Sequence, residues 1–180
     1  MANIYPIKED LSDIPFAELK VYEALEKLGK NFYIFHSVQW LKKTKMWAAT
    51  WKENDFLIIN RNLGALVLEV KGGDVEYTGT VFHQINTQTE EVFVLDSKKK
   101  KDPLSQAIDG AYHYRGVLEK IVGATETKKA LDDRFPVEVA VWFPGCDIGK
   151  KMKNFPLAYR EAEKAVLDLR SFEEGPQAIY

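Results

Sequence analysis

Two apolar runs joined by a short polar connection decide the fold of this chain. They are Glu53-Asn54-Asp55-Phe56-Leu57-Ile58-Ile59 and Ala65-Leu66-Val67-Leu68-Glu69-Val70-Lys71-Gly72-Gly73, with Asn60-Arg61-Asn62-Leu63-Gly64 between them. Apolar, β-branched runs around an Asn/Gly connection indicate a β-hairpin. If Arg61, Asn62 and Leu63 form the loop, Asp55 faces Glu69 across the two strands. The sequence leaves the loop length open, and a slip of one residue would undo this pairing.

Three charged side chains gather at the open end of this predicted hairpin. Directly opposed residues lie about 4.5–5.5 Å apart at Cβ, and the two-residue period of a strand puts Glu69 and Lys71 on one face. Two close carboxylates repel each other, and Mg²⁺ is usually held by one or two carboxylates with waters and phosphate oxygens. Asp55, Glu69 and Lys71 therefore predict a cation site that acts on a phosphate. The alternative is an ordinary surface Glu and Lys at a strand end, which this spacing alone does not exclude.

The hairpin resembles that of the nuclease-related domain (NERD) family, which belongs to the restriction-endonuclease-like PD-(D/E)xK superfamily. The resemblance rests on residues 55–59 and 63–72 and covers residues 14–143. It includes two further motifs in the family's order, Ala17-Glu18-Leu19-Lys20-Val21 and Asp102-Pro103-Leu104-Ser105-Gln106. Ala17 stands where the family commonly has Gly, and Asp102 where it commonly has Asn. Neither difference affects the acidic residues or Lys71.

The resemblance implies a metal-dependent deoxyribonuclease. The implied fold is α/β (α+β), a restriction-endonuclease-like core with a central mixed β-sheet and a catalytic hairpin flanked by helices. The implied catalytic residues are Asp55, Glu69, Lys71, Glu18 and Gln106. The implied ligands of Mg²⁺ or Mn²⁺ are Asp55, Glu69, Val70 and Glu18. DNA is the implied substrate, and a superfamily 1 helicase-type domain in the same full-length chain is an implied partner.

Two other functions remain open at this point. One is a nuclease fold that binds DNA or tethers a helicase without cutting. The other is an α/β interaction domain whose acidic pair is incidental, which would bind no metal.

Glu18 lies at the start of a helix predicted over residues 15–29. It begins an apolar stripe with offsets of three and four residues, formed by Val21, Tyr22, Leu25 and Leu28. A carboxylate in such a stripe needs a partner or a metal. The alternative is a first-turn Glu that is favoured by the helix dipole.

Gln106 lies in a helix predicted over residues 103–122, with Asp102 as N-cap and Pro103 as first residue. The predicted apolar stripe of this helix contains Leu104, Ile108, Ala111, Val117 or Leu118, and Ile121. Another face carries Gln106, Asp109, Gly110 and His113. That face could meet the metal site or nucleic acid, although a solvated polar face is the commoner explanation.

Composition restricts the kind of DNA binding. The 180 residues contain 25 Lys and Arg against 27 Asp and Glu, for a net charge of −2. Since a nucleic-acid coat protein usually has a strong basic excess, any DNA contact must be local and assisted by metal. The run of lysines at 98–101 is a candidate phosphate clamp or a solvated loop tip.

The remaining sequence features exclude several kinds of site. Cys146 is the one cysteine, so there is no disulfide framework or zinc cluster, and the three histidines lack ligand spacing. The chain has no signal peptide and no stretch long enough to span a membrane. The expected location is the cytoplasm, and the sequence indicates no oligomeric state.

The other elements complete the predicted organisation. Strands are expected at residues 32–38, near 74–84 and 91–95, and at 137–143. A Lys- and Trp-bearing loop is expected over 41–53, and a final helix over about 156–171. Residues 1–150 are predicted to form the nuclease-related domain. Residues 151–180 are predicted to form a C-terminal helix and tail that would lead to a further domain.

Overall fold

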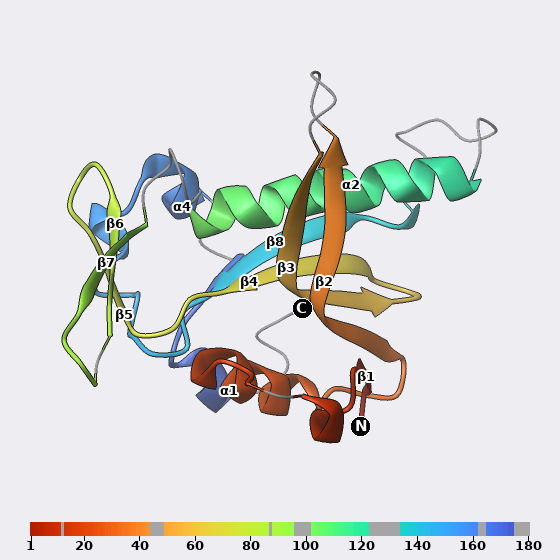
Figure 1. Cartoon of the computed structure of the whole chain (residues 1–180), viewed down its shortest axis with the longest axis horizontal. Coiled ribbons are helices and arrows are strands. Elements are labelled where there is room, and N and C mark those ends of the chain that lie inside the picture. The colour runs from red at the N-terminus through yellow and green to blue at the C-terminus, as the bar shows by residue number, and fades with distance from the viewer. Residues whose placement is uncertain are drawn as a thin grey trace.

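A mixed β-sheet forms the centre of the molecule in the computed structural model (Figure 1). The structure describes residues 1–11, 13–43, 49–86, 88–95, 102–122, 134–161 and 165–174. In this part of the chain the sheet has six strands in the order β1-β2-β3-β4-β8-β9. Their bounds are Asn3–Tyr5, Phe32–Lys43, Ala49–Asn60, Gly64–Val70, Val137–Trp142 and Val166–Leu167. The inner strands β2, β3 and β4 run antiparallel, whereas β1, β8 and β9 join in parallel pairings. The predicted α/β fold is confirmed and is consistent with a restriction-endonuclease-like core.

The predicted β3–β4 hairpin has the expected register. Asn60 pairs with Gly64 and Leu57 with Val67, so Arg61, Asn62 and Leu63 form the loop. Gly64 has φ +103°, and a Cβ there would lie 2.3 Å from the carbonyl oxygen of Pro136. Only glycine accepts this conformation and this close approach. Every residue of β4 is buried, as expected for a central strand between β3 and β8.

Helices cover the two faces of the sheet. On one face α1 (Phe16–Leu25) packs Val21, Tyr22 and Leu25 against the sheet, and the predicted stripe of this helix is confirmed. On the other face lies α2 (Pro103–Val122), with the predicted bounds. Asp102 accepts a hydrogen bond from the Ser105 N–H at 3.1 Å, as an N-cap does. None of the described helices combines the length and the apolar character needed to span a bilayer.

The predicted stripe of α2 is partly wrong. Leu104, Ala107, Gly110 and Ala111 are buried, whereas Ile108 is 37% and Ile121 74% exposed. Small residues form this contact face because the helix lies close to β4 and β8, where larger side chains would not fit. The polar face of the helix is not simply solvated either, since His113 stacks on Trp40 of β2.

The loop predicted over residues 41–53 is wrong for residues 41–43 and 49–53, which are strand, while residues 44–48 lie outside the described part of the chain. Strand pairing between β2 and β3 continues to Lys43 and Ala49, so the two strands extend beyond the sheet as a two-stranded arm (residues 38–43 and 49–54). α2 supports this arm through the Trp40–His113 stack and a 3.0 Å ion pair between Lys42 and Asp109. These partners lie far away in the sequence, so local composition gave no sign of them.

The last predicted helix is also wrong. Helix α4 covers Leu157–Glu161, and residues 162–164 lie outside the described part of the chain. Val166 and Leu167 form β9, which pairs in parallel with β8, and α5 follows at Ser171–Glu174. The β8 edge offers unpaired backbone groups, and the Trp142 Nε1–H donates to the Asp168 carbonyl oxygen at 3.0 Å. Pairing with this edge therefore outweighs helix propensity in the segment.

A smaller antiparallel sheet lies beside the central one (Figure 1). It contains β5 (Asp74–Tyr77), β6 (Phe82–Ile85) and β7 (Val92–Leu95), near the predicted strands. The turn from β4 into this sheet passes through Gly73, at φ +73°. The open end of the β3–β4 hairpin thus lies between the small sheet and α1.

Candidate functional site

Asp55, Glu69 and Lys71 lie together at the end of the β3–β4 hairpin. The Lys71 Nζ donates to Glu69 Oε1 at 2.7 Å. Asp55 Oδ2 accepts a hydrogen bond from the backbone N–H of Val70 at 2.6 Å, which ties the two strands together beyond the last paired residues. Glu69 is only 2% exposed. An acidic pair, in which Glu69 is buried and Asp55 half-buried, therefore occupies the predicted position with one lysine.

The two carboxyl groups hold protons unusually strongly. Burial, and after it the charge of Asp55, raises the pKa of Glu69 to about 7 against the opposing effect of Lys71. Burial likewise raises the pKa of Asp55 to about 6, against the opposing effects of Lys71 and of the Val70 N–H. Two desolvated carboxyl groups that interact with each other favour the protonated form, because the positive charge of Lys71 does not compensate both of them.

Lys71 remains an ammonium in this setting. Burial lowers its pKa, but the nearby carboxylates Glu69 and Asp55 more than offset that effect, so the net pKa is raised. A lysine held in this way can donate hydrogen bonds and positive charge. It is not a general base.

The second oxygen of Glu69 lacks a partner. Glu69 Oε2 is buried and makes no hydrogen bond within the described part of the chain. Such orphaned acceptors are rare and need an explanation. Across the described residues, no group of three or more His, Cys, Asp or Glu side chains could by itself hold a metal ion. Two carboxylates with waters and a phosphate would nevertheless suit Mg²⁺ or Mn²⁺, so the residues present fit such an ion.

Glu18 reaches the same site from α1. Its charge raises the pKa of both Asp55 and Glu69, and its Oε2 lies 2.8 Å from Nε2 of the buried His36. A Cβ on Gly72 would lie 2.8 Å from the Cβ of Ala17. The glycine thus lets the start of α1 approach the end of β4 and brings Glu18 toward the acidic pair.

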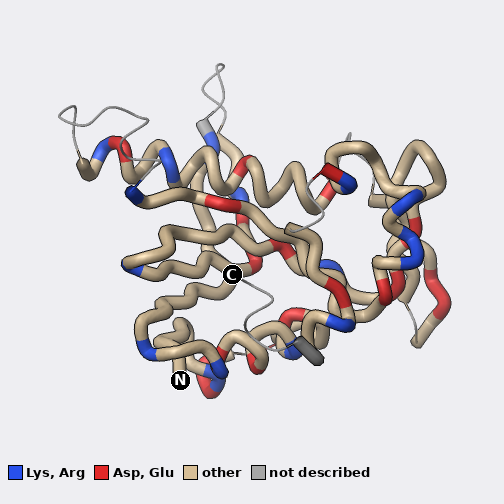
Figure 2. Tube along the Cα trace, turned by 180° about the vertical axis from the view of Figure 1, so that it is seen from behind, with Lys and Arg blue, Asp and Glu red and all other residues tan. Residues whose placement is uncertain are grey.

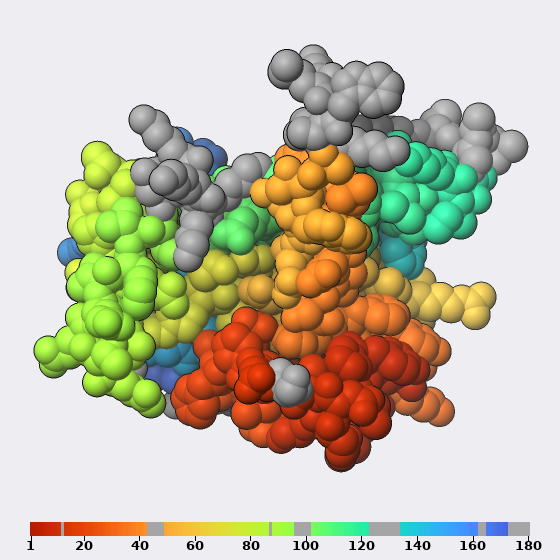
Figure 3. Space-filling model, viewed as in Figure 1, coloured from red at the N-terminus to blue at the C-terminus, as the bar shows by residue number. Residues whose placement is uncertain are grey.

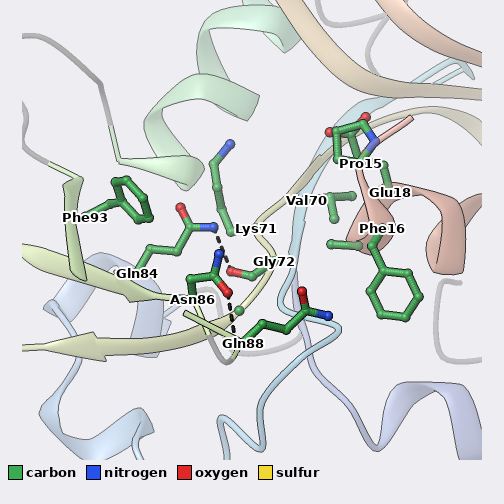
Figure 4. Close-up of a pocket in the computed structure, with 12 residues that line it drawn as sticks. Pro15, Phe16, Glu18, Val70, Lys71, Gly72, Gln84, Asn86, Gln88 and Phe93 are labelled. Carbon is green, nitrogen blue, oxygen red and sulfur yellow. Dashed lines mark hydrogen bonds between the residues drawn. The ribbon is translucent and has the colours of Figure 1, made fainter. Parts of the chain in front are cut away.

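Lys71 lies where two cavities meet. One cavity of about 460 Å³ is lined by Glu18, Val70, Lys71 and residues of the small sheet (Figure 4). The other, of about 400 Å³, is lined by Lys71, Gln106 and residues of the β2–β3 arm. Neither Asp55 nor Glu69 lines these cavities, so the acidic pair lies behind Lys71.

The predicted site residues are thus distributed over two groups. Asp55, Glu69, Lys71 and Glu18 interact with one another, and Gln106 shares only the second cavity with Lys71. Val70 contributes its backbone N–H to Asp55. The lysine run at 98–101 lies outside the described residues.

The sequence model of the nuclease-related domain matches residues 16–144. The chain belongs to the NERD family. The match covers more than half of the chain and nearly coincides with the range that the motifs predicted. No curated protein matches the chain, and no solved structure does. The family match over residues 16–144 makes this a nuclease-related chain.

Sequence reasoning missed two residues of this NERD site. His36 had no ligand spacing, yet it holds Glu18. Gln84 of β6 donates its amide N–H to the Gly72 carbonyl oxygen at 2.8 Å and lines both cavities (Figure 4). His36 lies on β2, opposite Phe56 of β3, which is next to Asp55. Pairing these two strands in the sequence would have placed His36 near the site.

Proposed function

We propose that this NERD domain hydrolyses DNA phosphodiester bonds with Mg²⁺ or Mn²⁺ bound at Asp55 and Glu69. The observation that carries the proposal is the buried, unpartnered Oε2 of Glu69 beside a second carboxyl group. Burying unpaired acidic oxygens costs stability, and a bound divalent cation would remove that cost. An incidental acidic pair at a strand end would not be buried in this way.

The acidic residues would act as ligands and orienting groups. Asp55 and Glu69 would hold the ion, and the Val70 N–H keeps Asp55 in place. Glu18, which acts electrostatically on both carboxyl groups, would bind waters of the ion. When bound, the ion would polarise the phosphate and lower the pKa of a bound water. His36 holds the Glu18 carboxylate in place, so His36 is a positioning residue.

Lys71 would contribute charge without moving a proton. Its side chain is 18% exposed and lines both cavities, so its ammonium can reach a bound phosphate. There it would stabilise the negative charge that develops as water attacks phosphorus and the ester oxygen leaves. Because the metal-free Glu69 already binds Lys71, cation binding would release the ammonium toward the phosphate.

Incubation of circular and linear DNA with the purified chain in Mn²⁺, Mg²⁺ or EDTA tests this function. Cutting is expected with metal only, and it should be lost in Lys71→Ala and Glu69→Gln. Glu23→Gln is the matched control, since Glu23 lies on α1 in an exposed ion pair with Lys8. Thermal melting shows that each variant is folded. The circular substrate separates endonuclease from exonuclease action.

The opposite result has a clear meaning. A folded chain that cuts neither DNA form with either metal, but binds DNA, would be a non-cutting module of a helicase-type protein. A helicase-type partner, the boundary at residue 150 and a cytoplasmic location stay predictions.

A further inference from the structure

The two cavities beside Lys71 adjoin each other, and together they are called the groove. Lys71 and Gln84 line both of them, so these two side chains stand between the two halves. Figure 3 shows the recessed surface between the small sheet on one side and α1 and the β2–β3 arm on the other. A polymer lying in both halves would therefore cross the acidic site at Lys71.

Exposed aromatic side chains lie in each half of the groove. Trp51, on the arm, is 69% exposed and lines the same half as Lys71 and Gln106. Phe16 and Phe93, which line the other half, are 69% and 48% exposed. Exposed apolar groups of this kind often mark a binding site. Trp51 and Phe93 offer flat rings, and the Phe16 ring carries the Lys20 ammonium 4.7 Å from its centroid. Successive unpaired bases stack on aromatic side chains of this kind.

Trp51 is presented by a supported arm. The neighbouring Trp40 donates its Nε1–H to Asn54 at 3.0 Å and stacks on His113 of α2 with ring centroids 4.4 Å apart. A Cβ on Gly110 would lie 2.3 Å from the Asn54 side chain, so α2 lies directly against the arm. The stacking surface is thus held in position before any ligand binds, which reduces the entropy cost of binding.

The charge distribution suits stacking better than duplex binding. Lys and Arg are interspersed with Asp and Glu along the described trace (Figure 2). Binding of duplex DNA depends mainly on phosphate neutralisation. Here Lys52 and Lys71 line the Trp51 half of the groove together with two acidic residues, Asp109, which is paired with Lys42, and Glu53, which accepts a hydrogen bond from Gln39.

Polar side chains in the other half add hydrogen-bonding groups. Gln84, Asn86 and Gln88 line that half and carry amide groups, which both donate and accept (Figure 4). Unpaired bases expose edges with the same two kinds of group, whereas a duplex engages them in pairing.

We propose that the groove binds single-stranded DNA, with bases stacked on Trp51 on one side of Lys71 and on Phe16 and Phe93 on the other. Binding of the strand does not depend on the proposed nuclease function; only the statement that the strand is the substrate rests on it. The backbone of the strand would pass Lys71, and its phosphates would contact Lys71 and Lys52. The enzyme would accordingly act on unpaired strands or ends.

Fluorescence anisotropy in EDTA tests this assignment without any cutting. The probes are labelled oligothymidine of about 12 nucleotides, within the range of single-strand sites, the duplex of the same length, and oligouridine. We expect single-stranded DNA to bind at least about tenfold more tightly than duplex. Trp51→Ala should weaken single-strand binding about tenfold, and Trp51→Phe should restore most of it.

Tyr112→Ala is the matched control. Tyr112 is 66% exposed on α2 and lines neither half of the groove, so its removal should leave binding unchanged. Equal affinity for duplex and single strand would overturn the proposal, as would a Trp51→Ala variant that binds like wild type. Tighter binding of oligouridine would overturn the choice of DNA. Single-strand binding without cutting in any metal would refute the nuclease function and leave the groove assignment intact.

Discussion

Lys71 Nζ and Glu69 Oε1 form a 2.7 Å ion pair in which the carboxylate keeps its other oxygen buried and unpartnered. The lysine therefore neutralises Glu69 only in part. Burial raises the pKa values of Glu69 and Asp55, and Lys71 offsets that effect only in part. Glu69 and Asp55 therefore link the stability of the domain to pH and to divalent cations.

The metal-free domain is expected to lose stability as the pH rises. The carboxyl pKa values are about 6 and 7 in the folded chain, against ordinary values of 3.8 and 4.5. Between about pH 4 and about pH 7 the folded state binds more protons, so the free energy of unfolding falls as pH increases. Glu69→Gln should remove about half of this slope, because Asp55 still titrates, and should add about 3 kcal/mol at neutral to alkaline pH. Urea unfolding in EDTA across this range measures both values.

Asp74→Asn is the control for this titration. Asp74 is also paired with a lysine, Lys151, but it lies on β5, away from the acidic pair. Its substitution should leave the slope unchanged. A wild-type slope that is flat or rises with pH would contradict the prediction.

Lys71→Ala should make the same pH dependence steeper. Without the ammonium, Glu69 and Asp55 lose their main positive neighbour. Removing one partner of a buried ion pair typically costs about 3–5 kcal/mol when the other remains charged. The cost should appear at about pH 8, where the carboxyl groups ionise, and be small at about pH 5, where they are protonated. Lys71→Arg keeps the charge and should restore most of the stability. Equal losses for Lys71→Ala at both pH values would show that packing, not charge, is responsible.

Mn²⁺ should raise the melting temperature of the wild-type chain. A ligand that binds only the folded state stabilises it by about 2.7 kcal/mol at one hundred times its dissociation constant. Glu69→Gln should abolish the shift. Glu18→Gln should reduce it, because the Glu18 charge reaches both carboxylates. Glu23→Gln, on the exposed side of the same helix, should behave like wild type. An equal shift in Glu69→Gln would place the ion elsewhere.

The sequence predicted the hairpin well because its determinants are local. Strand period, the Asn60–Gly64 connection and the glycine at the loop end favour the register that the structure has, although they leave the loop length open. α2 was predicted for the same reason, since its N-cap and proline stand at its first turn.

The missed features depend on contacts between distant residues. Lys42 and Asp109, which support the arm, are 67 residues apart. The partner of Glu18, His36, lies on another element, and β9 forms because β8 has an edge to pair with. The sequence identified the charged residues of the site, but not the side chains that hold them or the groove around them.

Gly110→Ala should destabilise the domain and disturb the arm. A Cβ at this position would lie 2.3 Å from Asn54, whose side chain accepts the Trp40 hydrogen bond. Overpacking of this kind costs about 1–3 kcal/mol. Gly116 lies on the same helix with nothing within 4 Å of its would-be Cβ, so Gly116→Ala should instead stabilise by about 0.5–1 kcal/mol through helix propensity. Urea unfolding gives both values, and oligothymidine anisotropy tests whether Gly110→Ala alone weakens binding at Trp51. If the two glycine variants behave alike in both measurements, α2 does not support the arm.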